Sequence, residues 1–181
     1  MKSSKLIFSA ALFFVFAIAM VFVSCDKSAV KYGETTYYKP CEGVVCLNGG
    51  NCLDGYCQCP VGFEGTKCEI RSNEKFYGNY EARDMCYMNG TDFYNVTIDA
   101  DPNLATKLVF NNIGTECPAA SITGFITSNK SDFQINSQNT CGDIWISGNG
   151  NMNGNIVNVY LAFRDSVLHQ TKTCSIVLNK K

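Results

Sequence analysis

The sequence has one histidine, His169, and no excess of charge of either sign. Fifteen basic and sixteen acidic residues give a formal net charge of -1, so the chain has no basic surplus for neutralising nucleic-acid phosphates. A single histidine cannot supply the paired histidines of a Cys2His2 zinc site. Glycine-rich phosphate-binding motifs are absent as well. These absences argue against nucleic acid as a partner and against a bound cofactor.

No arrangement of residues indicates catalysis. The acidic residues are scattered over predicted loops, and His169 falls in the last predicted strand with an exposed side chain. In "DADPN", Asp99, Asp101 and Asn103 are spaced like the first ligands of a calcium loop, but Leu104 replaces the expected glycine and no glutamate occupies the twelfth position. A turn explains this segment better. We therefore predict a protein that is not an enzyme and has no metal site.

Cysteine, in contrast, is abundant, with 11 among 181 residues. This density is typical of an oxidising compartment, where disulfides persist. All but one lie between Cys41 and Cys174, whereas Cys25 stands alone. An odd number leaves one thiol unpaired, intermolecular or modified, and Cys25 is the obvious remainder.

The first 25 residues have the layout of an export signal, in which Lys2 and Lys5 precede an uncharged apolar run from Leu6 to Val23. A run of this length could also be a retained transmembrane anchor. However, "FVSC" followed by polar "DKS" resembles the lipobox of bacterial lipoproteins, in which a signal peptidase cuts before a cysteine that carries diacylglycerol. The resemblance implies a lipoprotein signal peptide over residues 1–24 and lipidation of Cys25, with a disulfide between two chains as the alternative for this thiol.

Lipidation would make the membrane a partner, since two acyl chains suffice for stable anchoring. The resemblance places the protein in the cell envelope, with the outer membrane and possible surface exposure as the expected location. Residues 25–40 then form an acylated tether, because Asp26 to Pro40 mixes charge, glycine, threonine and proline without periodicity. Fully stretched, these fifteen residues reach about 50 Å.

Six cysteines follow with the spacing C-x4-C-x5-C-x4-C-x1-C-x8-C. About thirty residues cannot bury enough apolar surface to stay folded alone, so cross-links must replace a core. The closing "CQCPVGFEGTKC" resembles that of an EGF-like module, here residues 41–69. Spacing does not choose among fifteen pairings. The resemblance implies Cys41 with Cys52, Cys46 with Cys57, and Cys59 with Cys68. Calcium is not expected, since Lys39 and Pro40 stand where calcium-binding modules carry acidic residues.

Residues 70–181 have the pattern of strands. In "NIVNVYLAF", apolar Val157 to Phe163 alternate with outward positions that include Tyr160. The expected strands are 76–87, 93–99, 107–113, 121–127, 132–137, 143–147, 155–163 and 168–178, separated by segments rich in Asn, Gly, Asp and Ser, with Gly148 to Asn155 as a hairpin tip. These features predict a mainly β fold in which an antiparallel meander closes into a barrel, with a sandwich as the alternative.

Four cysteines belong to this second domain and allow three pairings. In a closed barrel the first and last strands are neighbours, which favours Cys86 with Cys174 and leaves Cys117 with Cys141, both in predicted turns. The segment "FYGNY" before the meander resembles the start of small calycin or lipocalin-like domains of bacterial lipoproteins. That resemblance implies an interior able to take a small hydrophobic ligand, although eight short strands also leave an interior that side chains can fill.

The chain has, in this order, an export signal, a lone cysteine, a tether and two disulfide-bonded domains. This order favours a lipid-anchored binding protein of the cell envelope. In this hypothesis the EGF-like module is a spacer that presents the β domain to a protein or glycan partner. The alternative is a lipocalin-like carrier of a small hydrophobic ligand, and an extracellular hydrolase is a third hypothesis.

Overall fold

The computed structural model describes residues 39–86, 90–117 and 120–181, which form a mainly β protein. Cys25, the predicted signal peptide and the predicted tether up to residue 38 lie outside these residues. The described residues from Pro40 onward belong to a compact unit that spans Pro40–Lys181. Within the described ranges, no helix is both long and apolar enough to cross a lipid bilayer.

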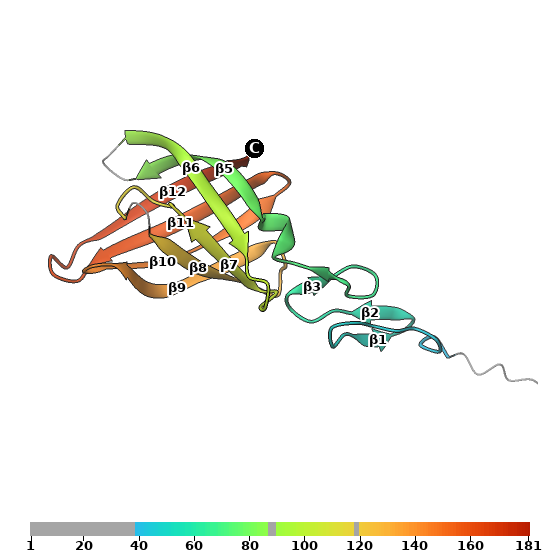
Figure 1. Cartoon of the computed structure of the whole chain (residues 1–181). Helices are drawn as coiled ribbons and strands as arrows, with labels where there is room; N and C mark the ends of the chain where they lie inside the picture. Colours follow the sequence, from blue (N-terminus) through green and yellow to red (C-terminus); the bar gives the residue numbers. More distant parts are fainter. Residues whose placement is uncertain (1–38, 87–89, 118–119) are drawn as a thin grey trace, which may run out of the picture. The chain divides into compact units, whose positions relative to one another are not determined.

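The EGF-like segment consists of two small hairpins held by disulfides. Strand β1 (Asn51–Leu53) pairs with β2 (Tyr56–Gln58), and β3 (Phe63–Glu64) pairs with β4 (Ile70–Arg71) (Figure 1). The turn between β1 and β2 has positive φ at both central residues, 49° at Asp54 and 88° at Gly55, as a tight hairpin requires. The structure contains the pairs Cys41–Cys52, Cys46–Cys57 and Cys59–Cys68.

The rest of the described chain is a closed barrel of antiparallel strands in which sequence neighbours are also spatial neighbours (Figure 1). A short 3-10 helix, η1 (Glu74–Phe76), precedes it. This meander confirms the predicted barrel over the sandwich. The strands are β5 (Gly78–Cys86), β6 (Gly90–Ala100), β7 (Lys107–Asn111), β8 (Ser121–Ile126), β9 (Asp132–Cys141), β10 (Ile144–Asn153), β11 (Ile156–Asp165) and β12 (Thr171–Lys180).

Two disulfides reinforce the barrel. Cys86 and Cys174 are direct partners across the seam where the first strand, β5, pairs with the last, β12, and they are bonded. The second bridge joins Cys117, in the connection after β7, to Cys141 at the end of β9. Cys141 is therefore a strand residue rather than a turn residue, because β9 runs to that position.

The barrel interior is mostly apolar and includes three packed aromatic rings. Phe133 lies 5.8 Å from Phe76 and 5.1 Å from Phe110, measured between ring centroids. Gly150 faces this cluster, and a Cβ there would lie 2.3 Å from the Phe133 ring. Since every side chain larger than hydrogen would collide with that ring, glycine is required at this position.

This packing explains a wrong prediction about Gly148 to Asn155. The segment was expected to be a hairpin tip, but it continues strand β10 to Asn153, and the turn is confined to the two residues that follow. Glycine and asparagine have low propensity for strands, which is why the segment has the composition of a turn. In the structure, the Phe133 ring leaves no room for a side chain at position 150, so glycine occurs within the strand. The prediction for His169 was also wrong in part: the residue is exposed, but it lies in the loop before β12 with φ of 55°.

A buried asparagine fastens the segment between β4 and the barrel. The Asn73 amide is fully buried, and its Nδ2 donates to the carbonyl oxygens of Asp101, Leu104 and Lys107 at 3.1–3.2 Å. Arg71 adds a hydrogen bond from Nη2 to the Asp101 carbonyl at 2.8 Å. One side chain thus adds a hydrogen bond to each of three backbone carbonyls at the β6–β7 connection.

Candidate functional site

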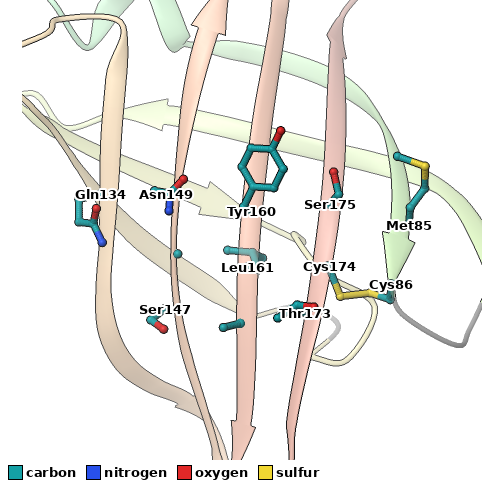
Figure 2. A pocket seen from close by; sticks show the side chains of 12 residues that line it. Met85, Cys86, Gln134, Ser147, Asn149, Tyr160, Leu161, Thr173, Cys174 and Ser175 are labelled. Atoms are coloured by element: carbon teal, nitrogen blue, oxygen red, sulfur yellow. A yellow bond between two sulfur atoms is a disulfide. The ribbon is translucent and has the colours of Figure 1, made fainter.

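The outer face of the barrel carries an open groove of about 700 Å³. Its centre is Tyr160 on β11, whose side chain points outward and is 53% exposed. Figure 2 shows Tyr160 between Asn149 on β10 and Ser175 on β12. The lining residues come from five strands and are Met85, Cys86, Gln134, Ser147, Gly148, Asn149, Tyr160, Leu161, Ala162, Thr173, Cys174 and Ser175.

Strand register explains the hollow. One row across the sheet contains Asn149, Tyr160 and Ser175 as successive Cα partners, with Met85 beyond Ser175 and Gln134 beyond Asn149. Outward residues two positions away on the same strands form the next row.

On β10, β11 and β12, that next row consists of small side chains. Ser147, Ala162 and Thr173 are successive partners on β10, β11 and β12. Side chains on one face of a sheet are neighbours across the strands. A row of small side chains next to a tyrosine therefore leaves an open space, with the small side chains as its floor and the tyrosine ring as its wall. The groove is therefore formed by a size difference between two adjacent rows.

The polar groups around Tyr160 are free to bind a ligand. Among the described residues, the tyrosine hydroxyl and the side chains of Gln134, Ser147, Asn149, Thr173 and Ser175 form no hydrogen bond. Elsewhere on the outer face, neighbouring polar side chains bind one another. Ser121 donates to Asn111, which donates to Asp99, and Gln138 bonds Thr123.

The groove is also uncharged. None of the described residues that line it is Asp, Glu, Lys, Arg or His. Charged outward residues lie one row further away. They are Arg164, two residues beyond Ala162 on β11, Arg83, two residues before Met85 on β5, and Asp132, two residues before Gln134 on β9. A ligand bound at the centre would meet hydroxyl and amide groups and one aromatic face.

A second feature is a carboxyl group buried inside the barrel. The Asp84 residue is 1% exposed and accepts a hydrogen bond from the Tyr94 hydroxyl at 2.8 Å, and that hydroxyl accepts from the Gly114 N–H at 2.9 Å. Burial raises the pKa of the Asp84 carboxyl above its ordinary value, and the bond from Tyr94 offsets part of that effect. Burial and the carboxylate next to it raise the pKa of Tyr94.

Asp84 also lies beside the seam disulfide, with Oδ1 3.2 Å from the Cys86 sulfur. The ligand atoms of Asp84, Cys86 and Cys174 lie within 4.8 Å of one another, which is a distance suited to a metal. However, metals bind thiolates, and both sulfurs are committed to the disulfide. The arrangement therefore fits a structural bridge rather than a metal centre.

We expect Asp84→Asn to weaken the pH dependence of stability. The pKa of the Asp84 carboxyl is higher in the folded state than its ordinary value of 3.8, so the protonated carboxyl contributes stability at pH values below 3.8. This contribution is lost as the pH rises through the folded-state pKa. An amide is neutral throughout and does not undergo that loss. Urea unfolding should therefore show the variant gaining relative to the parent between about pH 3.5 and about pH 7. Asp143→Asn, at an exposed residue in the turn between β9 and β10, is the control, and an equal difference at both pH values would contradict the prediction.

In the calcium-like segment "DADPN", Asp99 and Ala100 are the last residues of β6, and the predicted turn begins at Asp101. Asp101 Oδ1 accepts the N–H groups of Asn103 at 2.9 Å and Leu104 at 3.0 Å, and Oδ2 pairs with Lys107 at 3.0 Å. These bonds lower the pKa of the Asp101 carboxyl, with the bond from Lys107 contributing most. The carboxylate thus organises its own loop.

Sequence reasoning placed Tyr160 on the outward face but did not single it out. The alternation of apolar and polar residues within β11 predicts that the Tyr160 side chain points outward. The residues beside Tyr160 on β10 and β12 depend on the register between strands, which the sequence does not give. The carrier hypothesis expected a ligand inside the barrel, but this groove lies on the outside. A ligand bound there would remain in contact with solvent.

Comparison with known proteins confirms the EGF-like assignment. The chain is 39% identical over 66 residues to Protein lin-12 of Caenorhabditis elegans and 44% identical over 55 residues to the tissue-type plasminogen activator of Sus scrofa. These matches cover 35% and 27% of this chain, but only 4% and 8% of those proteins. No protein-family model matches the chain. The similarity thus concerns a module shared with much longer proteins.

Proposed function

We propose that this chain is a lipid-anchored binding protein of the bacterial cell envelope, in which the EGF-like module holds the barrel away from the membrane and the barrel binds a protein or glycan. The observation that carries the binding role is the groove around Tyr160, where six polar groups lack partners among the described residues. The EGF-like homology supports an interaction role for the first module.

The anchoring part of the proposal is supported by the sequence around Cys25. A lipid on this residue would account for its isolation from the ten cysteines that form disulfides. The tether would give the folded part a reach of about 50 Å from the membrane surface. Together these features favour a protein that is fixed at one end and binds with the other.

Site-specific photo-crosslinking in the native host tests the binding role. A benzophenone amino acid replaces Asn149, which is exposed beside Tyr160, in the full-length protein. The matched control position is Ser121, which is exposed on β8, on the far side of the closed strand order from β12. Irradiation of intact cells should give a discrete higher-mass adduct from position 149 and little from position 121.

The nature of the adduct identifies the partner. A species removed by protease but not by glycosidase is a protein partner, and the reverse indicates a glycan. Equal labelling from both positions, or no adduct from position 149, would contradict a binding role for this face.

A further inference from the structure

We infer that the Tyr160 groove binds a neutral carbohydrate. This inference rests on the proposed binding function and names the ligand class for the same site. The groove combines one outward aromatic ring, a floor of small side chains and a border of hydroxyl and amide groups, and none of the described lining residues carries a charge. Each of these properties has a counterpart in a pyranose ring.

The Tyr160 ring supplies the stacking surface. An aromatic face carries partial negative charge, and the C–H groups on one face of a sugar ring are weakly positive, so the two surfaces attract each other. Tyrosine has few rotatable bonds, and this one stands between Asn149 and Ser175, so little side-chain entropy is lost on binding. The floor of Ser147, Ala162 and Thr173 leaves space for a flat ligand beside the ring.

The border of the groove supplies hydrogen bonds of the kind that sugars need. Asn149 and Gln134 each offer an amide that donates and accepts, so each can bind a sugar hydroxyl, which also does both. Ser147, Thr173 and Ser175 add hydroxyl groups. Because these groups have no protein partner among the described residues, binding a sugar would not require any internal hydrogen bond to break.

The absence of charge among the lining residues separates this ligand class from others. Acidic sugars, phosphates and nucleotides need cationic side chains, and the described lining offers none. A protein partner usually buries an apolar centre with several large anchoring side chains, whereas this groove offers one aromatic ring and Met85, with hydroxyl and amide side chains beside them. A neutral, hydroxyl-rich ligand matches the lining best.

Affinity electrophoresis of the full-length acylated protein in detergent tests the inference. The probes are three neutral polysaccharides, a β-glucan, a mannan and an arabinan, with polygalacturonate as the acidic counterpart. At least one neutral polysaccharide should retard the protein, and polygalacturonate should not. Retardation only by the acidic polymer, or by none of the four, would overturn the inference.

Variants locate the binding at the groove. Tyr160→Ala should weaken binding at least about tenfold, since aromatic side chains that a ligand covers dominate binding energy. Tyr160→Phe keeps the ring and should retain most of the affinity. Ala162→Trp fills the floor between Ser147 and Thr173 and should abolish binding while every polar side chain of the border is kept.

The control is Tyr56→Ala, which removes a tyrosine that is 79% exposed on the EGF-like module and should leave binding unchanged. Circular dichroism and melting of each variant confirm that the barrel is folded. If Tyr160→Ala and Tyr56→Ala behave alike, the sugar does not bind at the groove and the inference fails.

The experiments distinguish a failure of the carbohydrate inference from a failure of the proposed binding role. Loss of carbohydrate binding together with a protein adduct from position 149 refutes the carbohydrate inference and leaves the binding role intact. No polysaccharide binding and no adduct from position 149 would refute both.

Discussion

Replacing Cys25 by serine should release the protein from the membrane almost completely. Without the thiol, no diacylglycerol can be attached, and the free energy of about 0.8 kcal/mol for each buried methylene is lost over every acyl chain. Release requires that the signal segment of the variant be cut at another position, and the released protein should incorporate no labelled palmitate. Membrane fractionation and palmitate labelling in the native host measure both effects.

Inhibition of the lipoprotein signal peptidase provides an independent route to the same result. Globomycin should cause a larger precursor of the parent protein to accumulate. Ser24→Ala is a matched control, because it changes the neighbouring residue but keeps a small side chain before Cys25. Unchanged processing under globomycin, or membrane retention of Cys25→Ser, would mean that the apolar run from Leu6 to Val23 is itself the anchor.

The second large effect is expected at the barrel seam. Removing the Cys86–Cys174 bridge by alanine substitution should lower the free energy of unfolding by about 4.6 kcal/mol in the chain-entropy model, because the bond closes a loop with a sequence separation of 88. This is a large part of the 5–15 kcal/mol that stabilises typical domains. Both cysteines are also buried, so their loss removes packing from the interior.

The second barrel bridge is the matched control for this prediction. Cys117 and Cys141 have a sequence separation of 24, so the same model gives a smaller loss of about 3.4 kcal/mol. Urea unfolding of the two double-alanine variants should therefore rank the seam bridge as the more stabilising. Equal stability of the seam variant and the parent would show that strand pairing alone closes the barrel.

The sequence predicted the fold well where the signal is local. Alternation in Val157 to Phe163 reports which face of β11 is buried, and turn residues mark most of the connections. Seam closure also followed from the sequence, because a meander of strands brings its first and last members together once the sheet closes.

Features that depend on contacts between distant residues were harder to predict. Gly148 and Gly150 have the composition of a turn, and only the approach of Phe133 and of the β11 backbone explains their place in β10. The Tyr160 groove depends on which residues of β10 and β12 stand opposite β11. A shift of the register by one residue would replace Ser175 and Asn149 with inward-facing side chains.

The buried Asp84 illustrates the same limit. Within β5 it occupies an inward position between Ala82 and Cys86, where an apolar residue is expected. Its hydrogen bond comes from Tyr94 on the next strand, and its position beside the disulfide depends on β12. Sequence alone identifies the exception to the pattern but not its partners.

The central claim is that all eleven cysteines are committed, one to lipid and ten to disulfides, in a protein built for the cell envelope. Intact-mass measurement of protein from the native host, with and without a thiol-alkylating reagent, tests it most directly. The account predicts a chain that begins at an acylated Cys25 and takes up no alkyl group. An alkylated thiol, or a Cys25 without lipid, would contradict it.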